Sequence, residues 1–319
     1  MTPQHRLLAR TMFQLKVHQA NGFEFERVFG QVLEYGRPGF QKVRPYGNTG
    51  DRGSDAYERD LGRYYQVFAP MDVKRSLAAA IQKVEVDFTT KLLPYWGTFC
   101  SPKEYFFVLN DKYSGTIFEV ERVLASLKTA NNLDESKVFL SKDLEDVFIN
   151  LAEDQIGMII GGVPSIEKTA FLDYSILGEV IRHVLSIPPS DARKSKLISP
   201  DFDKKITFNE LQDNGDWLRA KQREVWQVDE YLSKNGGFTK QHLRDSLSGF
   251  YEESIEAIKS SDSDISVGDL RFGYILDKIA PMTDDLNMDR LHKDAAMVLM
   301  SKYFETCDIF EEPKNASSR

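Results

Sequence analysis

The distribution of apolar positions divides the chain into two parts. In the first part, short apolar runs of strand character alternate with stretches whose apolar residues recur every three or four positions, as on one face of a helix. The predicted strands are 40–45, 54–58, 63–68, 104–110 and 136–141, and the predicted helices are 22–35, 72–93, about 117–127 and 144–151. Pro94 is expected to end the second helix. This order predicts an α/β fold with a mixed sheet and helices on its faces.

From about residue 165 the strand signal ends and only helical spacing continues. The predicted helices are 172–184, 206–234, 238–260, 266–280 and 287–306. A connector rich in proline and lysine, residues 186–205, is expected to be exposed. We therefore predict two domains, an α/β domain at 1–160 and an α-helical domain at 165–312, in line with a length of 319 residues.

Composition and charge exclude several classes of protein. No run of about 18 apolar residues could cross a bilayer, and the first residues lack the pattern of a signal peptide, so we expect a cytoplasmic protein with no membrane role. Cys100 and Cys307 are too few for a disulfide framework or a zinc site. A net charge of −8 argues against a protein that coats nucleic acid non-specifically.

The charge balance is reversed locally. Between Arg37 and Arg75 there are eight basic and five acidic residues. This stretch contains "GDRGSDAYERDLGRYYQVFAP" (50–70), in which two acids in a glycine-rich segment precede a glutamine on an aromatic run. It is either a solvated loop with ordinary surface charge or a surface that faces phosphates.

A hairpin of strands 54–58 and 63–68 would bring polar side chains together. Asp55 and Gln66 would then converge at one end of the sheet, beside the helix that carries Glu26. Carboxylate and amide oxygens are ligands that Mg²⁺ or Mn²⁺ accepts, with water and a substrate phosphate in the remaining positions. Such a metal would polarise a scissile phosphate and generate hydroxide for in-line attack.

The same segments resemble a known nuclease superfamily. Phe25 and Glu26 on a helix, followed by "GDRGSDAY" (50–57) and "YYQVFAP" (64–70), are similar to the PD-(D/E)XK nucleases, especially the Mrr-like restriction endonuclease branch. The resemblance implies a restriction-endonuclease-like fold to about residue 155 and divalent-metal-dependent cleavage of double-stranded DNA. It assigns the metal site to Asp55, Gln66, Glu26 and Asp51. The basic residues then expected to contact DNA are Lys42, Arg44, Arg52 and Arg63.

One position departs from the superfamily pattern. Two residues after Gln66, where these nucleases usually carry lysine, this chain has Phe68. An apolar ring cannot orient a water molecule or stabilise charge on a phosphate, so Lys74 or Lys42 would have to supply the charge from a neighbouring element. Two alternatives therefore stay open: a degenerate nuclease fold that binds DNA or subunits without cutting, and acids that only stabilise turns while Gln66 pairs with backbone.

Four segments of the second part resemble a second class of protein. They are "LGEVIRHV" (177–184), "FDKKITFNELQ" (202–212), "YLSKNGGF" (231–238) and "LRDSLSGFYEE" (243–253). They are similar to the helical C-terminal domains of effectors in ABC-three-component anti-phage systems, the Lamassu type among them. This implies an SMC- or Rad50-like ATPase and a small middle component as partners, with self-association on activation as a further expectation. The alternative is the core packing of an unrelated helical domain.

The function expected from both resemblances is a Mg²⁺-dependent endonuclease that is held in check by, and activated through, its ATPase partner. An unregulated nuclease would cut the genome of its own host, so dependence on a partner is expected. A structural assembly protein without a nucleic-acid role is a third hypothesis. The aromatic residues Tyr64, Tyr65 and Phe68 are expected in the core rather than stacked on bases.

Overall fold

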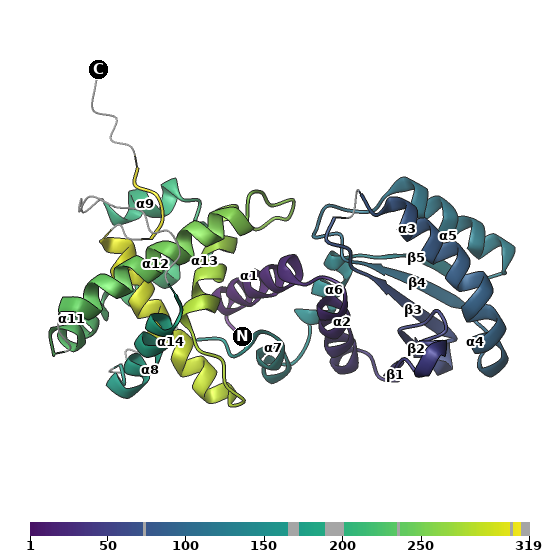
Figure 1. Cartoon of the computed structure of the whole chain (residues 1–319), viewed down its shortest axis with the longest axis horizontal. Helices are drawn as coiled ribbons and strands as arrows, with labels where there is room; N and C mark the ends of the chain where they lie inside the picture. The colour runs from purple at the N-terminus through teal and green to yellow at the C-terminus, as the bar shows by residue number, and fades with distance from the viewer. Residues whose placement is uncertain (73–74, 165–171, 189–200, 235–236, 307–308, 314–319) are drawn as a thin grey trace, which may run out of the picture. The chain divides into compact units, whose positions relative to one another are not determined.

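A mixed five-stranded sheet lies at the centre of the first part of the chain (Figure 1). The strands follow the order β1-β2-β3-β4-β5, with antiparallel pairing from β1 to β3 and parallel pairing from β3 to β5. Their bounds are Phe40–Lys42 for β1, Ala56–Glu58 for β2, Arg63–Phe68 for β3, Glu104–Leu109 for β4 and Glu135–Phe139 for β5. The predicted α/β class with a mixed sheet is therefore confirmed, and each strand overlaps a predicted one.

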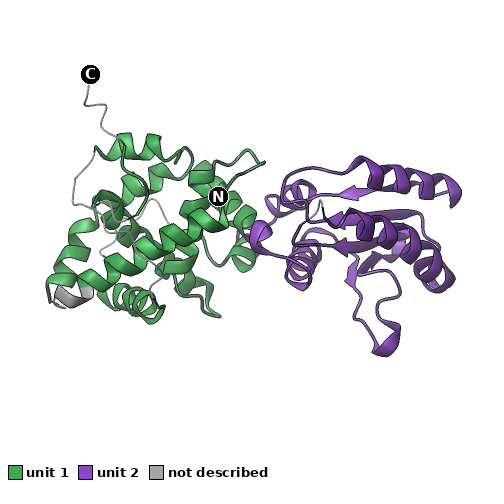
Figure 2. Cartoon of the chain, turned by 45° about the horizontal axis from the view of Figure 1, so that its top comes forward, with its two compact units in different colours: residues 1–15, 156–319 green, residues 16–155 purple. Residues whose placement is uncertain are grey.

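The computed structural model describes residues 1–72, 75–164, 172–188, 201–234, 237–306 and 309–313. The chain divides into two compact units (Figure 2). We call residues 16–155 the sheet unit, and residues 1–15 together with 156–319 the helical unit. Residues 1–15 were predicted to belong to the α/β domain at 1–160. In the structure they group with the helical unit.

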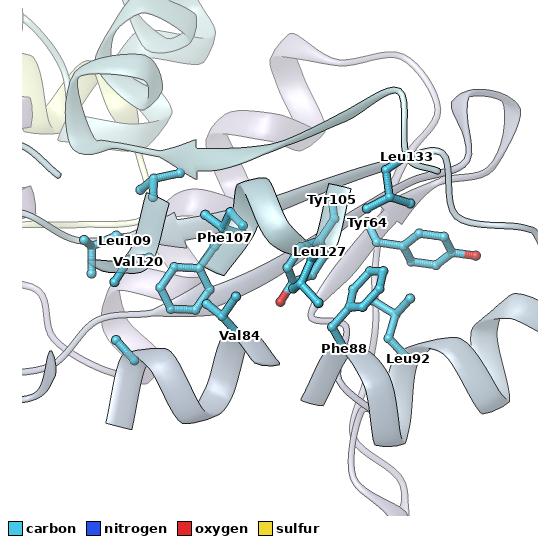
Figure 3. Packing of buried hydrophobic residues seen from close by; sticks show 13 residues of the cluster. Tyr64, Val84, Phe88, Leu92, Tyr105, Phe107, Leu109, Val120, Leu127 and Leu133 are labelled. Carbon is cyan, nitrogen blue, oxygen red and sulfur yellow. The ribbon is translucent and has the colours of Figure 1, made fainter. Parts of the chain in front are cut away.

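Helices of the sheet unit cover both faces of the sheet. They are α2 (Phe23–Gly36), α3 (Leu77–Gln82), the π-helix η3 (Lys83–Leu92), α4 (Leu93–Phe99), α5 (Phe118–Ala130) and α6 (Ser141–Phe148), with short 3₁₀ turns η1 (Gly47–Thr49) and η2 (Arg59–Leu61). On one face, Val84, Phe88 and Leu92 of η3 pack with Tyr105 and Phe107 of β4 (Figure 3).

The opposite face of the sheet packs against α2. The ring of Phe29 meets Tyr65 of β3 and Phe139 of β5 edge-on, with centroids 5.5 and 6.0 Å apart. Tyr64 and Tyr65 are each only 1% exposed, which confirms that these strand aromatics belong to the core. The apolar surface buried on both faces fixes the register of β3, because a slip of one residue would exchange its two faces.

The prediction that Pro94 ends the second helix is wrong. Helical backbone continues from Leu77 to Phe99, and Pro94 lies in the first turn of α4. The last turn of η3 is π-helical, since the N–H of Leu93 bonds to the carbonyl of Phe88. A proline is tolerated where one hydrogen-bonding pattern gives way to another, because its missing N–H then interrupts no regular α-helical ladder.

The described residues of the helical unit form helices and no strand. The helices are α8 (Tyr174–Ser186), α9 (Phe202–Phe208), α10 (Gly215–Gln222), α11 (Val225–Lys234), α12 (Gly237–Ala257), α13 (Val267–Ile279) and α14 (Leu286–Glu305). The predicted helical C-terminal domain is confirmed, although the single helix predicted at 206–234 is three helices. Within the described ranges, no helix is both long and apolar enough to cross a membrane.

Two helices that the periodicity did not predict contain residues of both units. They are α1 (Pro3–Gln19) and α7 (Glu153–Ile160). The first part of α1 belongs to the interior of the helical unit, where the buried Nδ2 of Asn214 donates a 3.0 Å hydrogen bond to the hydroxyl of Thr11. The helical unit is therefore built from two separate segments of the sequence.

Candidate active site

Asp55 lies directly before β2 and is fixed against β3. The pairing of Ala56 with Tyr65 places the preceding Asp55 beside Gln66. The backbone N–H of Asp55 donates to the carbonyl of Tyr65 (2.8 Å), and the N–H of Val67 donates to the Asp55 carboxylate (2.6 Å). The predicted hairpin thus brings position 55 next to position 66, and it anchors the acid to β3 through two hydrogen bonds.

Three acids, one from α2 and two from the segment that precedes β2, interact around this point. Burial raises the pKa of Asp55 to about 7, and the neighbouring carboxylates of Asp51 and Glu26 raise it as well, against the lowering effects of Lys83 and of the Val67 N–H. Burial also raises the pKa of Glu26 on α2, an effect that Lys83 opposes and Asp51 reinforces. Acids with raised pKa values that interact with one another are a feature of functional sites.

Lys83 is the cation that faces these acids. Its Nζ donates a 3.0 Å hydrogen bond to the carbonyl of Val67, and it interacts electrostatically with both Asp55 and Glu26. Lys42 and Lys74 are the lysines predicted from the sequence, and Lys83 was not predicted. Lys42 interacts electrostatically with Glu26, but its Nζ pairs with Glu34 at 2.9 Å. Lys74 lies outside the described residues.

Gln66 is held by side chains of the same face. Its Nε2 donates to Asp87 of η3 (2.8 Å), and its Oε1 accepts from the hydroxyl of Tyr105 (2.5 Å). Asp87 in turn pairs with Lys91 at 2.6 Å. The side chain of Gln66 is thus bonded to other side chains, and Lys83, Asp87 and Lys91 form a polar line along η3 beside its apolar residues.

The glycine-rich segment before Asp55 is anchored to the helix. The Asp51 carboxylate accepts from the N–H of Gly53 (2.7 Å), and the Asp51 carbonyl accepts from the indole of Trp96 (3.0 Å). Gly53 has a φ of +83°, and a Cβ there would lie 2.9 Å from the carbonyl oxygen of Asp87. Only glycine fits this close approach, which holds Asp51 near the other acids.

The remaining predicted DNA-contacting residues have different surroundings. Arg44 is exposed, whereas the guanidinium of Arg52 lies 3.8 Å from the ring centroid of Tyr95. Arg63 is mostly buried and pairs with Glu58 and Glu104, and the carboxylate of Glu104 helps to raise its pKa. A contact between Arg63 and a phosphate would therefore compete with two existing ion pairs.

The donor set suits a hard cation with few protein ligands. Across the described residues, no three His, Cys, Asp or Glu side chains converge as a metal cluster. Mg²⁺ is usually held by one or two carboxylates, with waters and substrate phosphates completing its coordination. Asp55 with Glu26 or Asp51 fits this pattern, because a cation would offset the burial and the carboxylate repulsion that raise the pKa of Asp55. Gln66 would have to exchange the hydrogen bond from Tyr105, or use its second lone pair, to bind a cation directly.

The helical region matches a known family. Residues 175–311, which extend from α8 past the end of α14, match the model of C-terminal domain 10 of the ABC-three component systems. The resemblance of the C-terminal half to proteins of these systems is thus confirmed, and the match supports membership of such a multi-component system. No curated protein and no solved structure is significantly similar to the chain.

Proposed function

We propose that the chain is the effector of an ABC-three-component anti-phage system and that its sheet unit is a divalent-metal-dependent endonuclease acting on double-stranded DNA. The observation that carries this proposal is the electrostatic interaction of Glu26 and Asp51 with Asp55, together with Lys83, whose Nζ is bonded to the Val67 carbonyl of β3. Such a group of interacting acids and one cation, drawn from different elements, has the charges that phosphodiester hydrolysis requires.

Each residue of the group has a distinct proposed role. Asp55, together with Glu26 or Asp51, would hold Mg²⁺ or Mn²⁺. When bound, the cation would polarise the scissile phosphate and lower the pKa of a bound water. Lys83 would place its ammonium where negative charge develops on the phosphate, the task that Phe68 cannot perform. Gln66 and Tyr105 would keep Asp87 in position.

The helical unit is proposed to bind the other components. Support comes from the match of residues 175–311 to a C-terminal domain of ABC-three component systems. An SMC- or Rad50-like ATPase and a small middle component are the proposed partners, and they would restrain the nuclease until phage infection. This division of labour assigns regulation to the helical unit and chemistry to the sheet unit.

A plasmid-nicking assay tests the nuclease proposal. The full chain, with the proteins encoded beside it, would be incubated with supercoiled DNA in Mg²⁺ or Mn²⁺. Asp55→Asn and Glu26→Gln should abolish nicking, and Asp55→Asn retains an acceptor for the Val67 N–H. Lys128→Met is the control, because this lysine forms a half-exposed ion pair with Glu135 on other elements. Nicking by both acid variants at the wild-type rate would contradict the proposal.

A non-catalytic adaptor is the second candidate function. Phe68 at the usual lysine position and the hydrogen-bonded amide of Gln66 favour it. It predicts that the wild-type complex binds DNA and leaves it intact in both Mg²⁺ and Mn²⁺.

A further inference from the structure

The loop between β1 and β2 presents one aromatic side chain to solvent. Tyr46 is 84% exposed, whereas the strand tyrosines Tyr64 and Tyr65 are core residues. Resting on the proposed nuclease function, we infer that this loop, residues 43–50, stacks the Tyr46 ring on an unpaired base next to the cleavage site. The preferred substrate would then be a duplex interrupted by unpaired nucleotides, such as a bubble, a gap or a flap.

The backbone of Tyr46 is held in place although its ring is free of the core. Its N–H donates to the carbonyl of Gly50 (3.1 Å), and its own carbonyl accepts from the N–H and the hydroxyl of Thr49 (3.2 and 2.7 Å). A ring on a fixed backbone loses little conformational entropy when it stacks on a base. The exposed ring of Tyr46 can thus stack on a flat ligand such as a base while its backbone stays fixed.

The charge around Tyr46 favours a polyanion. Residues 41–50 contain Arg44 and Lys42, which pairs with Glu34, and they contain no acid. Arg44 is exposed, and it has no ion-pair partner in the part of the chain that the structure describes. An exposed aromatic ring with basic neighbours is the combination by which proteins bind single-stranded nucleic acid, the ring stacking on bases and the cations facing phosphates.

Both ends of the loop lie close enough to Glu26 to interact with it. Lys42 precedes the loop and Asp51 follows it, and both interact electrostatically with Glu26. Tyr46 is five residues from Asp51, which an extended chain spans in at most about 18 Å. Because successive phosphates of one strand advance by about 3.4 Å along a duplex, the stacked base should lie within about five nucleotides of the scissile phosphate.

Binding of a fluorescent oligonucleotide tests this inference. The full chain carrying Asp55→Asn, which prevents cutting, would be titrated with a duplex that has a three-nucleotide bubble containing 2-aminopurine. Adding Tyr46→Ala should weaken binding to the bubble about tenfold and remove the fluorescence change, since stacking on a single base accounts for a loss of this size. Tyr46→Trp should preserve both. Phe118→Ala is the matched control, as Phe118 is 73% exposed on α5.

The outcomes separate this inference from the proposed function. Equal binding of the bubble by Tyr46→Ala and its Asp55→Asn parent would overturn the stacking role and leave the nuclease proposal standing. If Tyr46→Ala weakened binding to intact duplex as much as binding to the bubble, and left the 2-aminopurine fluorescence unchanged, Tyr46 would contact the DNA backbone and not a base. This outcome would also overturn the stacking role. Failure of the parent to bind any DNA at low salt would contradict both proposals.

Discussion

The Nζ of Lys83 donates a 3.0 Å hydrogen bond to the carbonyl oxygen of Val67. This bond brings an ammonium group from η3 to β3, one residue beyond Gln66 and next to Asp55. A positive charge therefore lies near Asp55 and Glu26, even though Phe68 occupies the position where the superfamily pattern has lysine.

Removal of the Lys83 charge should impair cleavage. Lys83→Met is expected to lower the nicking rate by at least about 100-fold, the usual effect of losing one group that stabilises charge in the transition state. The rate would be measured by single-turnover nicking, with Lys128→Met as the control. A second change offers a rescue, because Phe68→Lys in the Lys83→Met chain would return an ammonium to the same end of β3. An unchanged rate for Lys83→Met would exclude Lys83 from the chemistry.

The raised pKa of Asp55 should make stability depend on pH. The folded state binds a proton up to about pH 7, whereas the side chain of an unfolded aspartate, with its usual pKa of 3.8, loses it near pH 4. In EDTA, the free energy of unfolding of the wild type should therefore fall between about pH 4 and 7 relative to Asp55→Asn. One pKa unit corresponds to about 1.4 kcal/mol, so we expect a difference above about 1 kcal/mol. Urea denaturation at pH 5 and pH 8 checks this, and a constant difference would contradict it.

Divalent cations should stabilise the wild-type chain above pH 7. A cation that binds the ionised carboxylates raises the free energy of unfolding by about 1.4 kcal/mol at ten times its dissociation constant. Thermal unfolding with increasing Mg²⁺ or Mn²⁺ measures this without any activity. Asp55→Asn is expected to show a much smaller shift, and an identical shift in that variant would place the cation elsewhere.

Gly53 should tolerate no side chain. Gly53→Ala meets both an unfavourable φ of +83° and the carbonyl of Asp87 at 2.9 Å, so it should destabilise the fold by about 1–3 kcal/mol and displace Asp51. Gly50→Ala is the matched control, since its φ is +60° but a Cβ there meets nothing within 4 Å. Denaturant unfolding of both variants separates the backbone effect from the steric one. Equal losses would show that the contact with η3 is unimportant.

Asp269 should be required for the helical unit. It is fully buried and accepts hydrogen bonds from the N–H groups of Asp213 and Asn214 and from the hydroxyl of Ser266. Asp269→Ala leaves these donors unsatisfied and should cost more than about 2 kcal/mol. Asp216→Ala, which removes an exposed pair with Arg219, should cost less than about 1 kcal/mol. Circular dichroism during urea unfolding compares the two.

The sequence predicts the strands and the Asp55–Gln66 neighbourhood because both follow from local signals. Glycines and aromatic alternation define the hairpin, and pairing then brings the two positions together. Lys83 was not predicted because its contact with β3 depends on how η3 packs against the sheet, which no local signal in the sequence shows. Positions four apart share one face of any helix, so Lys83 and Asp87 lie on the same side of η3, and the contact of Lys83 with Val67 comes from the packing of η3 on β3.

Other elements could not be predicted because their causes are distant in the sequence. Residues of α1 are buried on several sides, among them Leu8, Met12 and Phe13, so no single apolar face marks the helix. The break between α9 and α10 is stabilised at Asp213 and Asn214 by Asp269, more than fifty positions away. Periodicity alone therefore predicted one helix where tertiary hydrogen bonds hold a turn.

The discontinuous helical unit has a consequence for protein engineering. Because residues 1–15 return to the same unit as residues 156–319, the sheet unit is an insertion within a helical host. A fragment starting at residue 156 would lose the Thr11 hydroxyl that receives the Asn214 side chain. By contrast, exchanging residues 16–155 for another domain would keep both segments of the host, and the hybrid could report whether the proposed partner binding and the proposed cleavage are separable.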